Sequence, residues 1–462
     1  MFKNTLIFVF LSQFTASQEL FNLDFHSRIS FEKNSSSSLS SYDSIPYNIK
    51  ISTHFFLNNS HRNLENLNGK FALKGLTNYT STLFYYKNKN IFFSLEPQKI
   101  SYYGGVSELP KKNEPFNNNL TINDLSSTSF ANIGLSIQKY GVKAGYGNWN
   151  NWSGPGIHNS LTMSNNADGI FALFISTSEP ISLHKNLDLY YKYSVSDNLI
   201  NNDGTDYFIS FSELKLRIKN TEIGLNKMVL SGGSEDIEWK YVDAIKTLYK
   251  STNMKYWDII NEFYISVEFK EPRMIAFLSN GGLNQPSVFE INEIYKNHTQ
   301  ANILGIRKYG IGKFRDFLWG FEYTRTIQGP HYDILPTPNW YSNKKYNYSR
   351  INNKFFGAHS GPDADDILFY LGYMNEGISV IFAYDYERHG VTYHFPPEVK
   401  LEQRFLITKK INKYSIKLYY EKEIYENYAF LNSNANVWSG LNEPGSIQRT
   451  KTLTFSIDKK IF

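Results

Sequence analysis

The chain has 462 residues, more than one compact soluble core usually holds, and it contains no cysteine, which excludes disulfides, thiolate metal sites and thiol catalysis. Lys and Arg number 48 against 43 Asp and Glu, so the net charge of +5 gives no reason to expect nucleic-acid binding. Aromatic residues make up 16% of the chain although its mean hydropathy is only −0.42. This combination favours sheets that are apolar on one face and polar on the other.

The N-terminus has the organisation of a secretory signal peptide. Lys3 supplies a positive charge, residues 5–11 are mostly apolar, and small residues precede a predicted cleavage before Gln18. The apolar run is about half of the ~20 residues that a membrane-spanning helix needs. The sequence therefore predicts a signal peptide over 1–17 and one mature domain over 18–462. The alternative for the start of the chain is a buried N-terminal strand.

Strict alternation of apolar and polar residues recurs along the mature chain. It is clearest in segments 132–138, 262–270, 317–324, 378–387 and 414–420. Alternating segments of about nine to eleven residues match tilted strands that cross a bilayer, whereas soluble strands usually stop near five or six. We therefore predict an all-β fold, a transmembrane outer-membrane β-barrel of roughly sixteen to twenty antiparallel strands. A soluble two-sheet sandwich is the alternative.

The polar phase of these segments is expected to line the lumen of the barrel. Glu262, Glu268, Glu322, Asp385 and Glu387 are each out of phase with an apolar run. We predict that these five carboxylates point inward while the apolar side chains face lipid. Aromatic residues near the segment ends suit the two membrane interfaces. Because every strand offers such carboxylates, the sequence does not single out a catalytic acid and base pair.

One stretch between predicted strands is typical of a helix. Residues 234–250 follow two glycines and begin with Ser234 as a cap, with acidic residues in the first turn and apolar residues at helical spacing. A helix between barrel strands either plugs one mouth of the barrel or lies in an extracellular loop. The sequence leaves both positions open.

Motifs that usually carry catalysis or metal binding are missing or weak. The 10 His form no H-E-x-x-H, and no phosphate-binding loop occurs. His158 and Ser160 are too close in sequence to indicate a catalytic pair. Asp363, Asp365 and Asp366 could ligate calcium, but a solvated turn or an ion-pair network with lumen arginines is the favoured interpretation. The sequence therefore predicts no enzyme, no cofactor and no metal site.

Aromatic and amide residues are densest around a Gly-Pro-Gly turn at residues 154–156. Trp149, Asn150 and Trp152 precede the turn, and His158 follows it. Tryptophan faces and amides can hold sugar rings by stacking and hydrogen bonding. These four residues are therefore candidates for glycan binding. The alternative, which the residues alone favour, is a tight turn packed by tryptophans inside the barrel mouth.

Two blocks in the chain resemble the capsule-assembly outer-membrane protein family of the Wzi type. They are residues 152–167, WSGPGIHNSLTMSNNA, and residues 361–366, GPDADD, with support from 321–324 and 384–388. Ser153 stands where the family pattern leads us to expect a bulky residue before Gly-Pro-Gly. The resemblance implies a closed barrel of about eighteen strands that attaches or organises surface polysaccharide without catalysis. It brings no catalytic residue to this chain.

Three functions from different classes remain open at this point. The favoured one is a non-enzymatic outer-membrane barrel that binds or anchors exported capsular or surface polysaccharide and helps to assemble the capsule. Its partners would be that polysaccharide, outer-membrane lipid and the barrel-assembly machinery, with no nucleic acid. The first alternative is a porin-like diffusion channel for small solutes such as sugars. The second is a barrel enzyme acting on lipid or glycan. Bulky inward residues such as Tyr264 favour a filled lumen, and hence binding over transport.

Overall fold

The computed structural model describes most of the chain after residue 24. The described residues are 25–34, 47–60, 65–104, 112, 114, 116, 126–148, 150–201, 204–233, 257–270, 273–283, 300–311, 314–327, 340–341, 343–392, 394, 396–434 and 442–461. The predicted signal peptide, the predicted helix over 234–250, Trp149 and Phe462 lie outside them. Among the described residues, no helix combines the length and the apolar character needed to span a membrane.

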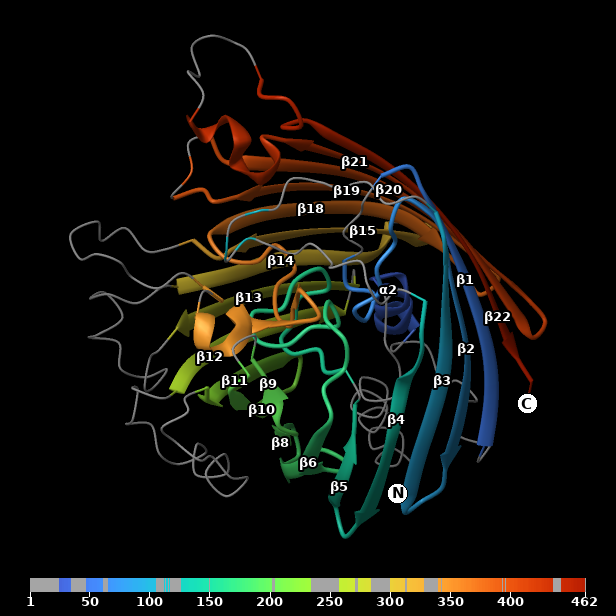
Figure 1. Ribbon diagram of the computed structural model, residues 1–462. Helices are drawn as coiled ribbons and strands as arrows, with labels where there is room; N and C mark the ends of the chain where they lie inside the picture. The colour runs from blue at the N-terminus through green and yellow to red at the C-terminus, as the bar shows by residue number, and fades with distance from the viewer. Residues whose placement is uncertain are drawn as a thin grey trace.

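The wall of the molecule is one large antiparallel sheet (Figure 1). Its first strands are β1 (Tyr47–Asn58), β2 (Gly75–Lys87), β3 (Ile91–Tyr103), β4 (Thr128–Lys139), β5 (Val142–Gly147), β6 (Ala172–Thr177), β7 (Ile181–His184), β8 (Leu187–Ser196), β9 (Leu199–Ile200) and β10 (Asp206–Ile218). The remaining strands are β11 (Thr221–Gly232), β12 (Trp257–Lys270), β13 (Arg273–Leu283), β14 (Gln300–Ile311), β15 (Phe314–Arg325), β18 (Ala364–Met374), β19 (Ile378–His389), β20 (Glu398–Ile411), β21 (Tyr414–Glu426) and β22 (Gln448–Lys460).

The sheet closes on itself because the first strand pairs with the last. β1 pairs with β2 on one side and with β22 on the other, where Phe55 lies opposite Phe455. The sheet has 20 strands, of which β7 continues β6 against β8, and β9 continues β8 against β10. In the described part of the chain, eighteen strands therefore form the closed wall. The predicted all-β barrel of about eighteen antiparallel strands is confirmed.

Short turns and long connections lie at opposite ends of the barrel. Residues 88–90, 219–220, 375–377 and 412–413 join neighbouring strands at the end where β22 also finishes. The other end carries the longer connections, such as the one between β15 and β18. In outer-membrane barrels the short turns face the periplasm and the long loops face outward. We therefore refer to these two ends as the periplasmic and extracellular ends.

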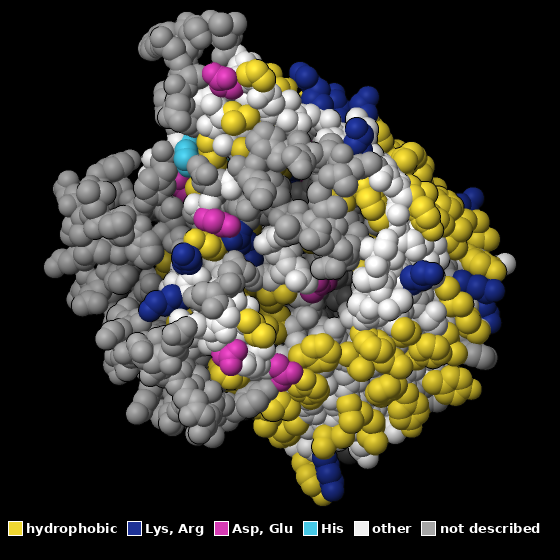
Figure 2. Space-filling view, in the orientation of Figure 1, with side chains coloured by type: hydrophobic (Ala, Val, Ile, Leu, Met, Phe, Trp, Pro, Cys, Tyr) yellow, Lys and Arg dark blue, Asp and Glu magenta, His cyan; other side chains and the backbone are white. Residues whose placement is uncertain are grey.

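Side chains along each strand alternate between lumen and outer surface. On β12, Phe263 and Phe269 are exposed on the outside, whereas Glu262 and Tyr264 are buried on the inside. Figure 2 shows hydrophobic side chains gathered on the outer face of the wall over β3, β4 and β5. So much exposed apolar surface is unfavourable in water and favourable against hydrocarbon. The outer face is thus suited to lipid.

Parts of the chain fold back into the lumen (Figure 1). Helix α2 (Phe25–Asn34) lies near the periplasmic end, where Arg273 donates hydrogen bonds to the carbonyl oxygens of Glu32 and Lys33. Three further pieces come from long connections: the first (65–74), second (148–171) and third (340–363) inner segments. The third contains η3 (Lys344–Ser349), β16 (Arg350–Ile351) and β17 (Lys354–Phe355), while η4 (Tyr428–Asn434) follows β21.

The largest apolar core lies between the inner segments and one side of the wall. It is formed by the second and third inner segments against β10–β14. Its members include Leu161, Met163, Ala167 and Ile170 from the second segment, Trp340, Tyr341, Phe355 and Phe356 from the third, and Tyr207, Phe211, Met228, Leu230, Ile260, Phe277 and Ile303 from the wall. Burying each large apolar side chain contributes about 1.5–3 kcal/mol. This core therefore fixes both segments inside the barrel.

Candidate functional site

The second inner segment turns sharply at its Gly-Pro-Gly sequence. Gly154 has a φ of +75°, a conformation that favours glycine, and a Cβ there would lie 2.7 Å from Oε1 of Glu262. A Cβ at Gly156 would lie 2.2 Å from the carbonyl oxygen of Asn159. The two glycines thus allow a turn that the lumen wall and the following residues would otherwise block.

The turn presents three successive backbone N–H groups to one carboxylate of the wall. Ile157 N donates to Oε2 of Glu322 at 2.8 Å, and Asn159 N donates to Oε1 at 2.7 Å. His158 N donates to the same carboxylate at 3.2 Å. Successive N–H groups that converge in this way form an anion-binding concavity. Glu322 therefore holds the main chain of the second segment against β15.

Asn159 connects the two sequence blocks that carry the family resemblance. Its Nδ2 donates to Oδ2 of Asp366 at 2.6 Å and to Oγ1 of Thr324 at 3.1 Å. Its Oδ1 accepts a hydrogen bond from the backbone N of His359 at 3.1 Å. Residues 152–167 and 361–366 are thus brought together inside the barrel, with His158 and His359 side by side.

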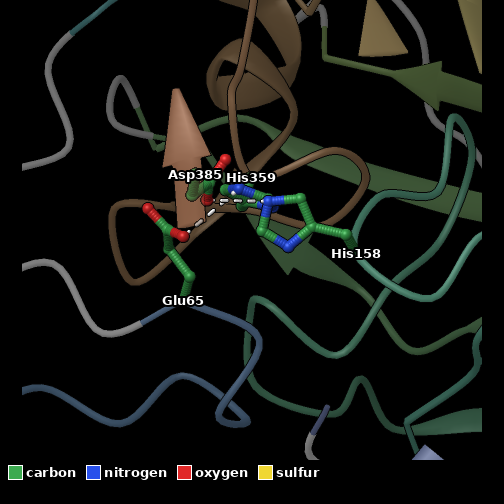
Figure 3. A group of neighbouring side chains, drawn as sticks. All are labelled: Glu65, His158, His359 and Asp385. Atoms are coloured by element: carbon green, nitrogen blue, oxygen red, sulfur yellow. Dashed lines mark ion pairs between the residues drawn. The ribbon is translucent and has the colours of Figure 1, made fainter. Parts of the chain in front are cut away.

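Two histidines and two carboxylates converge at this point, as Figure 3 shows. Nε2 of His158 lies 2.9 Å from Oδ2 of Asp385, and Nε2 of His359 lies 3.2 Å from Oε2 of Glu65. The two imidazole rings meet edge to face with centroids 4.3 Å apart. Glu65 comes from the first inner segment, the histidines from the second and third, and Asp385 from β19. All four side chains are buried.

The electrostatics of the cluster favour one positive charge between the histidines and the carboxylates. Burial alone would lower the pKa of His158, but the facing carboxylates of Asp385 and Asp366 raise it to about 10. Burial and the neighbouring His158 hold the pKa of His359 well below its ordinary value. The carboxylates thus favour a cation next to His158, either a proton on its ring or another positive ion in the same place, while burial favours the neutral form of His359.

Two cations from β20 complete the cluster. Arg404 donates from Nη2 to Oε2 of Glu65 at 2.7 Å and to Oδ2 of Asp385 at 2.8 Å. Lys400 donates from Nζ to Oε1 of Glu387 at 2.7 Å and also pairs with Glu65. These ion pairs tie the first inner segment to the wall at β19 and β20.

The residues predicted to bind glycan make contacts within the protein. The Arg28 guanidinium lies 3.2 Å above the centre of the Trp152 ring, and Nε1 of Trp152 donates to Gly156 O at 2.7 Å. Nδ2 of Asn150 donates to Oδ1 of Asn68 at 2.9 Å. His158 belongs to the buried cluster, and Trp149 lies outside the described residues. Their role in glycan binding stays a prediction.

Four of the five carboxylates predicted to point inward, Glu262, Glu322, Asp385 and Glu387, are buried within the barrel. Glu322, Asp385 and Glu387 take part in the contacts above. Glu262 on β12 accepts hydrogen bonds from β11, β13 and the second inner segment, through the side chains of Asn226, Ser279 and Thr162. Glu268 is only half-buried and pairs with Arg273 at 3.0 Å near the periplasmic end.

The three aspartates that the sequence offers as possible calcium ligands have hydrogen-bond or ion-pair partners within the protein. Asp363 accepts hydrogen bonds from the backbone N and Oγ1 of Thr392. Asp365 pairs with the guanidinium of Arg388. Asp366 accepts from Asn159 and faces His158. Of the three, Asp365 is thus the one seen paired with an arginine, whereas Asp363 and Asp366 accept hydrogen bonds from Thr392 and Asn159.

Sequence reasoning missed several members of the cluster. Lys400 and Arg404 alternate with Val399 and Leu401 in a strand, so the two-residue period could have placed them in the lumen. His359 lies in an irregular segment, as does Glu65, and no periodicity points to either. These two side chains are brought together by tertiary folding, and no local sequence motif predicts the contact.

Comparisons with known proteins support the fold. No family model matches the chain, and no curated protein matches it in sequence. Among solved structures, the chain is similar to Wzi of Escherichia coli, described as an outer-membrane protein involved in group 1 capsule assembly and a carbohydrate-binding β-barrel. The identity is 11% and the TM-score 0.64, over 95% of this chain and 89% of that one.

The chain is also similar to solved porin structures, at lower scores. A BenF-like porin from Pseudomonas fluorescens Pf-5 matches 90% of this chain and 99% of its own length, at 8% identity and a TM-score of 0.50. OccAB4 of Acinetobacter baumannii matches 91% of this chain and 100% of its own length, at 10% identity and 0.47. The closed eighteen-stranded wall and its apolar outer face make this chain an outer-membrane β-barrel.

Proposed function

We propose that this barrel binds exported capsular or other surface polysaccharide and helps to assemble the capsule, without cleaving the polymer. The observation that carries the proposal is the occupied lumen. The inner segments lie in the middle of the barrel and are held to the wall by the apolar core on one side and by Glu322 and the ion pairs on the other. An occupied lumen favours a binding role over diffusion of solutes.

The resemblance to the Wzi type supports the same proposal. Its two blocks, residues 152–167 and 361–366, build the inner structure through Asn159 and Asp366. The solved structure of Wzi, a carbohydrate-binding barrel by its description, shares the fold over most of both chains. The polysaccharide would bind at the extracellular end of the barrel. Outer-membrane lipid would surround the wall, and the barrel-assembly machinery would be a transient partner.

The buried cluster favours a non-enzymatic role. A general acid or base must come within hydrogen-bond reach of its substrate. His158 has a relative exposure of 2% and Asp385 of 0%, and both are engaged with other protein groups. A polymer outside the barrel would not reach them. The cluster is therefore better suited to holding the inner segments than to catalysis.

The test is to delete the gene and measure cell-bound and released polysaccharide. Deletion should shift polymer from the cell to the medium, and the wild-type gene should restore retention. Purified barrel should bind the polymer and leave its length unchanged. Because stacking one sugar on an aromatic ring contributes only about 1 kcal/mol, binding should strengthen with polymer length.

Two further variants ask whether the predicted glycan residues contribute. With equal amounts of the protein in the outer membrane, Trp149→Ala combined with Trp152→Ala should loosen the surface polysaccharide layer. Trp319→Ala, on the outer face of β15, is the matched control and should leave the layer intact. Unchanged retention in the deletion strain would reject the proposed function. Shortening of the polymer by purified protein would reject its non-enzymatic character.

A further inference from the structure

Four possible metal ligands meet at one point of the lumen. Ligand atoms of Glu65, His158, His359 and Asp385 all lie within 4.8 Å of one another. Figure 3 shows that the two imidazoles and two carboxylates point toward a common centre. The sequence predicts no metal site because these ligands come from four separate parts of the chain. Only the fold assembles them.

We infer that Glu65, His158, His359 and Asp385 bind one divalent transition-metal ion of the zinc type, which ties the three inner segments to β19. Zinc bound at 2.0–2.1 Å by four tetrahedral ligands separates neighbouring ligand atoms by about 3.3 Å. The His158–Asp385 distance is 2.9 Å and the His359–Glu65 distance is 3.2 Å. Two of the six pairs of donor atoms thus already have nearly the spacing of such a tetrahedron, and the other pairs lie within 4.8 Å.

The histidine nitrogens provide a second observation. His158 and His359 have relative exposures of 2% and 4%. Within the described part of the chain, neither Nε2 has a hydrogen-bond partner in regular geometry, although both lie close to carboxylate oxygens. Buried nitrogens are normally satisfied. A metal ion at the common centre would satisfy both.

The surrounding charge also favours a cation. Around the proposed site, the carboxylates outnumber the two permanently charged cations, Lys400 and Arg404. These carboxylates are Glu65, Asp366, Asp385, Glu387, Glu402, Glu421 and Glu423. Arg404 shares oxygens with two of the proposed ligands, and a carboxylate oxygen has lone pairs for both an N–H donor and a metal. Such outer contacts orient metal ligands in many sites.

The ligand set selects the class of metal. Two imidazole nitrogens with two carboxylate oxygens suit zinc and related transition metals, whereas calcium and magnesium prefer oxygen ligands alone. Four protein ligands form a closed set, as in structural zinc sites. The ion would therefore have a structural role, joining residues that are far apart in sequence.

The experiment uses the mature protein purified from outer membranes in detergent, stripped with EDTA and titrated with Co²⁺. We expect one Co²⁺ per chain with the intense visible absorption of tetrahedral coordination, displaced by one equivalent of Zn²⁺. An excess of Ca²⁺ should leave the spectrum unchanged. Absence of a stoichiometric tetrahedral spectrum in the wild-type protein would overturn the inference, as would equal displacement by Ca²⁺.

Variants locate the ion. His158→Gln and His359→Gln should each weaken Zn²⁺ binding by about 100-fold or more, since loss of even an outer partner costs about 10- to 100-fold. His54→Gln is the matched control, because His54 hydrogen-bonds Ser456 on the wall and lies outside the proposed ligand set. Barrel assembly is checked by heat modifiability. Wild-type Zn²⁺ affinity in assembled His158→Gln and His359→Gln would overturn the inference.

Discussion

The inner segments are held by apolar packing on one side of the lumen and by charged groups on the other. Toward β10–β14, Leu161 and Trp340 lie in a core of aliphatic and aromatic side chains. Toward β15 and β18–β20, Glu322 and Asp385 receive hydrogen bonds and ion pairs from the same segments and from Arg404. The same pieces of chain thus experience two different kinds of interior.

The two kinds of contact contribute differently to the stability of the inner segments and to their exact position. Apolar burial is roughly proportional to area and has little directionality, so it holds a segment without fixing each atom. Buried ion pairs repay their desolvation cost only in good geometry, which makes them weak evidence for net stability. Three N–H groups on Glu322, however, define where residues 157–159 lie. We infer that the apolar side supplies most of the stability and the charged side most of the positioning.

The largest effect is expected where one partner of the buried ion network is removed. Lys400→Met leaves Glu65 and Glu387 without their shared cation, which should cost about 3–5 kcal/mol. Hydrogen exchange of amides in the inner segments measures the free energy of local opening. Lys410→Met, on the same strand but exposed, should change little. Equal effects of the two substitutions would contradict the assigned network.

The apolar side is tested by shortening one buried side chain. Leu161 is fully buried, and Leu161→Ala should destabilise the second inner segment by about 2–5 kcal/mol through lost transfer energy and the cavity left behind. Exchange of amides near residue 161 reports this loss. Leu453→Ala on the outer face is the control, because that side chain is 42% exposed. A larger loss at Leu453 would reverse the assigned facing.

A smaller and more local effect is expected at Glu322. Glu322→Gln removes the charge that accepts three backbone N–H groups, at a cost of about 1.5–3 kcal/mol. Faster exchange should be confined to the amides of residues 157–159, with the core around Leu161 kept. The exposed Glu376→Gln serves as control. Retained protection of residues 157–159 would show that Glu322 does not position them.

The wall of the barrel follows from the sequence because period-two alternation is a local property. Phe263 and Glu262 are neighbours in sequence and point to opposite faces of the strand. The apolar side chain faces lipid and the charged one faces the lumen. The fold class and approximate strand number are therefore predictable from the pattern of residues alone. The same period would also have placed Lys400 in the lumen.

The contacts inside the lumen could not be predicted in this way, because they join residues that are far apart in the sequence. His158 meets His359 and Glu65 across irregular segments, and no spacing rule relates these positions. The sequence predicts that Trp152 binds glycan, because tryptophan rings serve both in sugar binding and in packing. In the structure its ring lies against the Arg28 guanidinium. Residue type alone does not separate a packed aromatic from a binding one. The glycan-binding role of Trp152 stays a prediction, which the double variant with Trp149 tests.

The central claim is that the lumen is occupied and the barrel does not serve as an open channel. Single-channel recording of the purified mature protein in a planar bilayer tests it most directly. We predict no stable open-channel current, because the inner segments are fixed by the Leu161 core and by Glu322. Reproducible steps of steady conductance, with the inner amides still protected from exchange, would contradict the account and favour a diffusion channel.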